Sequence, residues 1–230
     1  MLQITVKSFT DFVQLADSIG GAEDVTIFRG QPVKGNLLPA LARGNRSKNI
    51  RSHEQEMLEQ LNLTAATMMS GVANTPLDIL VFAQHFGLRT RLLDWTTNPL
   101  IALWFACSDA RDGDVYVYAF DATKHIDSNA YRSEPLSFIE TRVFQPRFNN
   151  PRIIAQQGWL SIHGISPVTL NFHPLEDNEV TRGNLQEFVV PAALRQSILE
   201  SLDRSGVNAS SVFPDFAGLC TYLNWRHRTR

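Results

Sequence analysis

The sequence has few cysteines and no long apolar run. Cys107 and Cys220 are the only two cysteines in 230 residues, too few for a disulfide framework or a cysteine-based metal site. Free thiols fit a reducing compartment, and the N-terminus shows no basic-then-apolar signal pattern, so we expect a cytoplasmic protein. No segment reaches the roughly 18 consecutive apolar residues of a membrane helix. We therefore expect no membrane partner.

The common motifs of cofactor-dependent and hydrolytic enzymes are also missing. The chain contains no GxGxxG or GxxxxGK[ST] phosphate loop, no HExxH or CxxC, and no GxSxG nucleophile motif. Metal dependence is therefore not expected. The formal net charge of -2 gives no electrostatic case for general nucleic-acid binding, although a local basic groove remains compatible with it.

The composition and the pattern of apolar residues predict one α+β domain over residues 1–230, with a mixed, mostly antiparallel sheet flanked by helices. The hydrophobic content of 43% is ordinary for a globular chain. Helical spacing and capping signals predict helices, with Ser8 as an expected N-cap and Thr75-Pro76 as an expected helix opening, and short β-rich runs predict strands. The expected helices are 8–19, 51–70, 77–86, one starting at Pro99, one starting at Pro191, and a short one within 210–219 that packs Phe213, Phe216 and Leu219. The expected strands are 25–28, 114–120 and 188–190. The expected irregular segments are a polar loop at 44–49, a long excursion or lid at 121–150, a loop at 171–184 and a fraying basic tail at 224–230.

The stretch 83–107 contains the highest density of informative residues. Asn98 followed by Pro99 is typical of a helix start, and the helix that follows is apolar on all sides, which indicates burial. The preceding loop carries Arg89, Arg91 and Asp94 close to the core, where charges are seldom found unpaired. One interpretation is a structural Arg–Asp pair. The other is a polar pocket wall presented by a rigid helix start.

Arg29 stands at the end of a predicted buried strand, followed by Gly30. The arginine fork suits either a carboxylate from another segment or a phosphate. Gly30 permits close approach of a ligand or of backbone. Glu54, near the start of a predicted helix, is expected in solvent by default, or else turned inward towards an arginine. His85 is interpreted as a capping or core residue more readily than as a base.

Several segments together closely resemble the FRG domain family, which is named after its Phe-Arg-Gly tripeptide. The resemblance spans about residues 25–219, and the segment QHFGLRTRLLDWTTNP is the most specific part. The matching positions are Phe28-Arg29-Gly30-Gln31, the run LLPALAR, residues 84–96, Asn98-Pro99, Ala102, Phe105-Ala106, Arg152, Gln156-Gln157-Gly158 and Phe213-Pro214-Asp215.

A second resemblance is to ADP-ribosyltransferases of the arginine–serine–glutamate type. It implies a similar fold and NAD as a substrate, with no separate cofactor. Arg29 would hold the pyrophosphate or ribose, and Thr96 or Thr97 would orient the arginine or the glutamate. Either Glu187 or the pair Gln156/Gln157 would occupy the glutamate position. Here Asp94-Trp95-Thr96 replaces Ser-x-Ser. The implied substrate-binding residues are Gly30, Gln31, His85, Arg89, Arg91, Asp94, Trp95, Arg152 and Gln156.

Three hypotheses follow. The first is an enzyme that transfers ADP-ribose to a protein or nucleic acid, as a bacterial toxin or phage-defence effector with an antitoxin or other regulatory partner. It requires Arg29, Thr96 and a carboxylate in one open cleft. The second is a non-catalytic nucleotide-binding or protein-interaction module, with the cleft but without the carboxylate. The third is a buried structural network of Arg29, Arg91 and Asp94, with no cleft.

Overall fold

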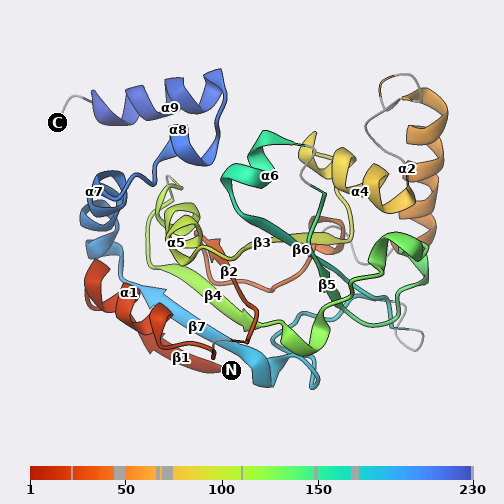
Figure 1. Cartoon of the computed structure of the whole chain (residues 1–230), viewed down its shortest axis with the longest axis horizontal. Helices are drawn as coiled ribbons and strands as arrows, with labels where there is room; N and C mark the ends of the chain where they lie inside the picture. Colours follow the sequence, from red (N-terminus) through yellow and green to blue (C-terminus); the bar gives the residue numbers. More distant parts are fainter. Residues whose placement is uncertain are drawn as a thin grey trace.

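A seven-stranded sheet forms the centre of the part of the chain that the computed structural model describes (Figure 1). The described residues are 1–21, 23–43, 50–65, 68, 75–109, 111–147, 150–166 and 171–228. The strand order is β1-β7-β4-β2-β3-β6-β5. The strands are β1 (Leu2–Thr5), β2 (Thr26–Gln31), β3 (Leu92–Thr96), β4 (Val115–Asp121), β5 (Arg142–Phe144), β6 (Gly158–Ile162) and β7 (Leu185–Val190).

All neighbouring strands are antiparallel except β1, which runs parallel to β7. The predicted α+β class with a mixed, mostly antiparallel sheet is therefore confirmed. The strand predicted at 114–120 is β4, and it lies inside the sheet between β7 and β2, as its apolar faces indicate.

Helices surround the sheet, and several begin at the residues that the sequence predicted. The α-helices are α1 (Phe9–Asp17), α2 (Ile50–Thr64), α4 (Pro76–His85), α5 (Pro99–Cys107), α6 (Pro151–Ala155), α7 (Arg195–Arg204), α8 (Ala209–Val212) and α9 (Phe216–Arg226). Ser8, Thr75 and Asn98 cap α1, α4 and α5 by accepting a backbone N–H within the first turn. These caps are local contacts, which explains why the sequence shows them.

Short 3₁₀ helices fill the connections. They are η1 (Ala40–Arg43), η2 (Thr123–His125), η3 (Ala130–Arg132), η4 (Pro135–Ser137), η5 (Arg182–Asn184) and η6 (Ala192–Leu194). Three of them, η2 to η4, and the strand β5 lie within the segment 121–150, which the sequence predicted as a long excursion or lid.

Other expectations were wrong in detail. The loop expected before Asn98 contains β3. The edge strands β1 and β5 were not predicted because they are only four and three residues long, too short for a clear strand pattern. The basic tail does not fray before Arg226, because α9 continues to that residue and its guanidinium lies 2.9 Å from Asp203 Oδ2. Phe216, expected to pack, is 80% exposed. The loop predicted at 44–49 and the helix end predicted at 70–71 lie outside the described residues.

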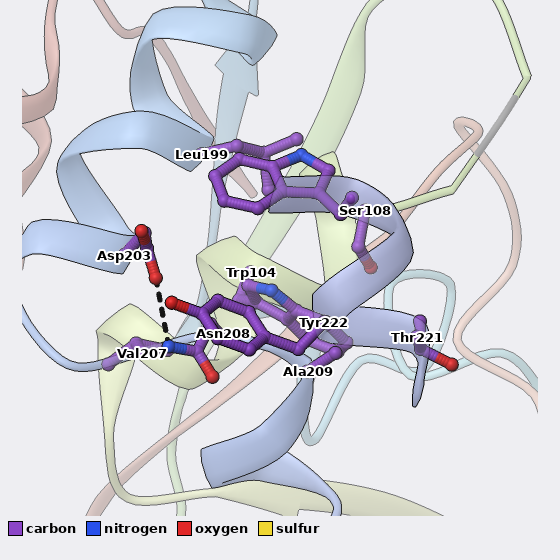
Figure 2. A pocket seen from close by; sticks show the side chains of 10 residues that line it. Trp104, Ser108, Leu199, Asp203, Val207, Asn208, Ala209, Thr221 and Tyr222 are labelled. Carbon is purple, nitrogen blue, oxygen red and sulfur yellow. Dashed lines mark hydrogen bonds between the residues drawn. The ribbon is translucent and has the colours of Figure 1, made fainter. Parts of the chain in front are cut away.

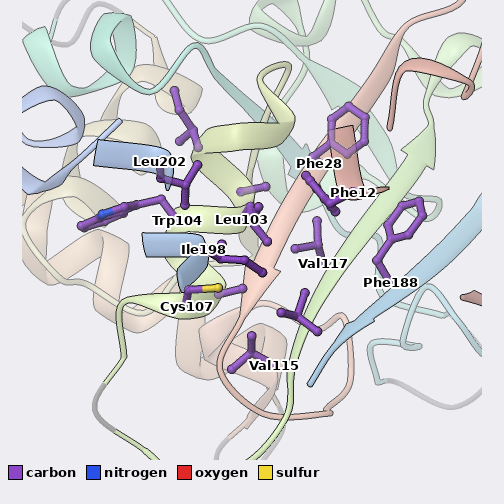
Figure 3. Close-up of a cluster of buried hydrophobic side chains, with 14 of the residues drawn as sticks. Phe12, Phe28, Leu103, Trp104, Cys107, Val115, Val117, Phe188, Ile198 and Leu202 are labelled. Carbon is purple, nitrogen blue, oxygen red and sulfur yellow. The ribbon is translucent and has the colours of Figure 1, made fainter. Parts of the chain in front are cut away.

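The largest apolar cluster lies on one face of β2, β4 and β7, beneath α1, α5 and α7 (Figure 3). The rings of Phe12 and Phe188 meet edge to face at 5.7 Å between centroids. On the same face of β2, Gly30 lies directly under α5: a Cβ there would come within 1.9 Å of the carbonyl oxygen of Ala102. The Phe-Arg-Gly tripeptide therefore fixes how closely α5 lies on the sheet.

The other half of the sheet has its own core. Residues of α4 and α6 pack against β3, β5 and β6, and a further cluster on the opposite face includes Trp95, Tyr118 and Phe120. Within the described ranges, no helix has both the length and the apolar character needed to cross a membrane.

Candidate functional site

The sheet is nearly divided between β2 and β3. Only Phe28 and Thr96 pair across these two strands, whereas β2 pairs with β4 over six residues. Next to that single pair, the side chain of Arg29 makes one further hydrogen bond from β2 to β3. Its Nη1 donates to the carbonyl oxygen of Asp94 at 2.8 Å, and its Nε donates to Gln31 Oε1 at 3.2 Å. Arg29 thus occupies the gap between the two half-sheets.

Two cavities meet at Arg29 and Gly30. The first, which we call the Asp94 cavity, has a volume of about 330 Å³. It is lined by Phe28, Arg29, Gly30, Gln84, His85, Asp94, Trp95, Thr96, Phe105, Arg152, Gln156 and Phe213. The second, the Arg43 cavity, has a volume of about 390 Å³. It is lined by Arg29, Gly30, Gln31, Pro32, Val33, Gly35, Asn36, Leu38, Ala42, Arg43 and Arg111. Each volume is within the range of small-molecule sites.

Positive charge predominates around these cavities. Burial lowers the pKa of Arg29 to about 10, which leaves the guanidinium protonated at neutral pH. Burial also lowers the pKa of Arg43, although Asp94 opposes the shift. The pKa of His85 is lowered by burial and by Arg152, against the opposing effect of Asp94, so the imidazole is neutral at pH 7. The lining therefore suits an anionic ligand.

A hydrogen-bonded chain holds the carboxylate of Asp94 in place. Gln84 Nε2 donates to Asp94 Oδ1 at 2.7 Å, and the hydroxyl of Thr90 donates to Gln84 Oε1. The side chain of Asp94 is otherwise exposed towards the cavity opening. A fixed carboxylate therefore faces the space beside Arg29.

The C-terminal part of the chain builds the opposite wall. Arg152 Nε and Nη2 donate to Asp215 Oδ2 at 3.0 and 2.5 Å, and the guanidinium lies 5.2 Å from the centroid of the Phe213 ring. Gln156 Nε2 donates to the carbonyl of Val212 at 3.3 Å. The segment between α8 and α9 thus orients two polar side chains that line the Asp94 cavity.

Thr96, Trp95 and Gly30 make structural contacts other than the ligand contacts expected for them. The hydroxyl of Thr96 accepts from the backbone N–H of Asn98 at 3.0 Å and is not a partner of Arg29. The indole N–H of Trp95 donates to Ser161 Oγ at 3.0 Å, and only 3% of the residue is exposed. The close approach allowed by Gly30 is taken by the backbone of α5. All three residues nevertheless line the Asp94 cavity.

Arg91 lies in neither cavity. It is fully buried, and its Nη2 and Nε lie 2.6 and 2.8 Å from Glu54 Oε2, while Nη1 donates to the carbonyl of Pro135. The side chain of Arg91, expected to bind substrate, is therefore not accessible to a ligand in either cavity. The default expectation of a solvated Glu54 was wrong, and the alternative, a carboxylate turned inward to an arginine, is what the structure shows.

Three further predicted residues also lie outside the cavities. Arg89 is exposed and lines neither. Gln157 has a left-handed backbone (φ 46°), and its carbonyl accepts from the N–H of Thr97. Glu187 lies on β7, and β4 lies between it and Arg29. Tyr118 of β4 pairs with Arg29 on one side and with Glu187 on the other. Two strand spacings amount to roughly 10 Å. The buried carboxylate of Glu187 instead lies 3.2 Å from Lys34 Nζ.

The sequence-based reasoning missed Gln84, Arg43, Phe105, Phe213 and Asp215 as site residues. All five belong to the segments that resemble the FRG domain family. Their position in those segments is the sequence feature that could have identified them. Within the described ranges, no group of three or more His, Cys, Asp or Glu side chains is arranged to hold a metal ion.

The family model of the FRG domain matches residues 24–115 of this chain. The match runs from just before β2 to the first residue of β4, and it includes Arg29, Gly30, Gln84, His85 and Asp94. Arg152, Gln156 and Asp215 lie beyond it. Searches of curated proteins and of solved structures found no match.

Proposed function

Starting from the FRG domain match, we propose that the cleft around Arg29 binds NAD and that the protein is an ADP-ribosyltransferase-like enzyme. One observation carries the proposal. A charged guanidinium with only neutral hydrogen-bond partners lies between two half-sheets, where two cavities of ligand size meet. The arginine fork matches the geometry of phosphate oxygens.

The arrangement of the cavities fits the shape of a dinucleotide. In NAD the pyrophosphate lies between two nucleoside halves, and Arg29 lies between two cavities. Arg43 lines one cavity and Arg152 the other, so each contributes positive charge close to the central anion. The rings of Phe105 and Phe213 line the Asp94 cavity, and we assign that cavity to the nicotinamide half.

The chemistry assigned to this site is cleavage of the bond between nicotinamide and ribose. The bonding electrons leave with the ring nitrogen, neutral nicotinamide departs, and positive charge develops on the ribose. The carboxylate of Asp94 stabilises that charge, and a nucleophile of the acceptor then bonds to the ribose carbon and loses its proton. We assign the carboxylate role to Asp94 because Glu187 lies two strands away from Arg29.

The second candidate, a non-catalytic nucleotide-binding module, is favoured by Gln156. An amide lines the cavity just before β6, at one of the two places where the resemblance implies the catalytic glutamate. In addition, Asp94 already accepts a hydrogen bond from Gln84, which reduces its capacity to bind a ribose.

Binding and turnover of NAD by matched variants separate the two candidates. The wild type, Arg29→Met, Asp94→Asn and Arg89→Met are titrated with NAD by calorimetry. They are then incubated with adenylate-labelled NAD and cell lysate while nicotinamide release and label transfer are followed. Arg89→Met is the control, since this exposed arginine lines neither cavity.

Each outcome decides between specific alternatives. Loss of turnover in Asp94→Asn with retained NAD binding supports the enzyme. Binding that depends on Arg29, with no turnover by the wild type, supports the module. A wild type that does not bind NAD overturns both. Action as a toxin or phage-defence effector on a protein or nucleic acid, under control of an antitoxin, is part of the proposal only if turnover is found.

A further inference from the structure

A small aromatic pocket lies between α5, α7 and α9 (Figure 2). Its volume is about 80 Å³, and the rings of Trp104, Tyr222 and Trp225 and the carboxylate of Asp203 form part of its wall. The remaining lining residues are Ser108, Leu199, Val207, Asn208, Ala209 and Thr221. None of these residues lines the two cavities at Arg29. We propose that this pocket binds a methylated ammonium group.

The volume limits the ligand group to a few heavy atoms. An engineered protein cavity of about 150 Å³ accommodates benzene, which has six carbon atoms. By proportion, the present pocket admits about three heavy atoms. A trimethylammonium group, with one nitrogen and three methyl carbons, is just above this size and would fill the pocket to its opening. A nucleobase or an aromatic side chain is too large.

The chemistry of the lining selects a cation with an apolar surface. Faces of tryptophan and tyrosine rings attract cations, and a methylated ammonium gives up little hydration when it enters an apolar pocket. The rings of Tyr222 and Trp225 lie at 24° to each other with their centroids 6.4 Å apart. Asp203 adds a negative charge at the wall, and its side chain is 13% exposed. An unmethylated ammonium would lose more hydration than this lining restores.

The chain's own arginines already use the outer parts of this site. Arg226 Nη1 donates to Asp203 Oδ2 at 2.9 Å and to the hydroxyl of Tyr222 at 3.0 Å. Arg226 and Arg228 lie 5.9 and 5.1 Å from the ring centroids of Tyr222 and Trp225, respectively. The lining therefore attracts cations, and Arg226 competes with a ligand for the charge of Asp203.

The test compares choline with its neutral isostere 3,3-dimethylbutan-1-ol, whose carbon replaces the ammonium nitrogen. Binding to the full chain is followed by saturation-transfer NMR and by tryptophan fluorescence. We expect saturable choline binding and, because the attraction requires positive charge, at least about tenfold weaker binding of the isostere. Equal binding of the two compounds, or no saturable binding of choline, would overturn the proposal.

Three variants locate the site. Asp203→Asn keeps the size of the side chain and should weaken choline binding about fivefold, whereas Asp17→Asn, an exposed control on α1, should leave it unchanged. Arg226→Gln should strengthen binding, since it removes the competing cation. Unchanged affinity in both Asp203→Asn and Arg226→Gln contradicts the assigned pocket. A trimethyllysine peptide and phosphatidylcholine vesicles, titrated in parallel, distinguish a protein source of the group from a lipid source.

Choline binding to this pocket should be independent of the Arg29 cleft. NAD at saturating concentration should leave choline affinity unchanged, and Arg29→Met should still bind choline. Failure of NAD binding therefore leaves this inference intact, and failure of choline binding leaves the NAD proposal intact.

Discussion

The side chains of Arg29 and Arg91 both lie within the fold, but they differ in the groups to which they donate hydrogen bonds. Arg91 is fully buried and contacts the carboxylate of Glu54 and the carbonyl of Pro135. Arg29 is partly exposed, and its described hydrogen bonds go to a backbone carbonyl and a side-chain amide, both neutral. Arg91 is therefore paired directly with a carboxylate, whereas Asp94 meets Arg29 through its backbone carbonyl and acts on it with its carboxylate only from a distance.

The contrast shows how a buried arginine can be classified. A guanidinium that meets a buried carboxylate supports structure, because the pair balances its charge where water is excluded. A guanidinium held only by neutral groups is fixed in position without being neutralised, which is the condition for binding an anionic ligand.

The largest expected effect comes from breaking the Arg91 pair. Glu54→Ala leaves Arg91 charged, buried and without its carboxylate, and it should lower the free energy of unfolding by about 3–5 kcal/mol in urea denaturation. The control Glu56→Ala, an exposed residue of the same helix, should change it by less than about 0.5 kcal/mol. Similar values for the two variants would contradict the structural role of Arg91.

Removing Arg29 should act on binding more than on stability. Arg29→Met should weaken NAD binding by about 1.5–3 kcal/mol, as expected for hydrogen bonds to a charged group. The loss in the free energy of unfolding should be near 1 kcal/mol, about the value of one neutral hydrogen bond. Calorimetry and urea denaturation of the same sample measure both quantities. A destabilisation as large as that of Glu54→Ala would make the two arginines equivalent.

A smaller effect should follow from releasing Arg152. Asp215→Asn removes the charge that orients Arg152 but keeps a side-chain oxygen able to cap α9, where Asp215 now accepts from the N–H of Gly218. We expect NAD affinity to fall about threefold with little change in stability, since this ion pair is largely exposed. Asp215→Asn should have no further effect on NAD affinity in an Arg152→Met background. A full effect in that background would show that Asp215 acts elsewhere.

The smallest effect is expected from pH. Because burial lowers the pKa of Arg29 to about 10, Arg29 stays protonated between pH 7 and 9, where NAD affinity should change less than about twofold. As pH rises through about 10, Arg29 loses its proton and the affinity should fall. Any residual affinity of Arg29→Met should lack this fall. A decline centred near pH 8 would assign the binding charge to another group.

The sequence predicted what depends on near neighbours. Ser8, Thr75 and Asn98 are caps formed within one turn, and the all-apolar α5 is buried because every face of that helix contacts protein. Arg29, Gly30, His85, Asp94, Arg152 and Gln156 were named from the sequence, and all line one cavity. The same resemblance also named Arg89, Arg91, Gln157 and Glu187, which lie outside both cavities, and the functional role of the named residues remains a prediction.

The partners of the arginines could not be predicted, because they are distant in sequence. Arg29 meets Asp94 across 65 residues and Arg91 meets Glu54 across 37. Such contacts depend on strand order and on how the helix α2 packs against the sheet, which apolar periodicity does not encode. The same limit explains why Glu187 was a candidate: a carboxylate at the start of a strand is visible in the sequence, but the two-strand separation from Arg29 is visible only in the sheet.

The single backbone pair between Phe28 and Thr96 links ligand occupancy to the mechanics of the sheet. Opening the sheet at this point breaks far fewer backbone bonds than at any full ladder, and the two half-sheets are held here mainly by the buried cluster around Trp95 and Tyr118. A ligand that contacts both Arg29 on β2 and Asp94 on β3 binds only the closed arrangement and thereby stabilises it. Amide hydrogen exchange at this junction should therefore slow in proportion to NAD saturation.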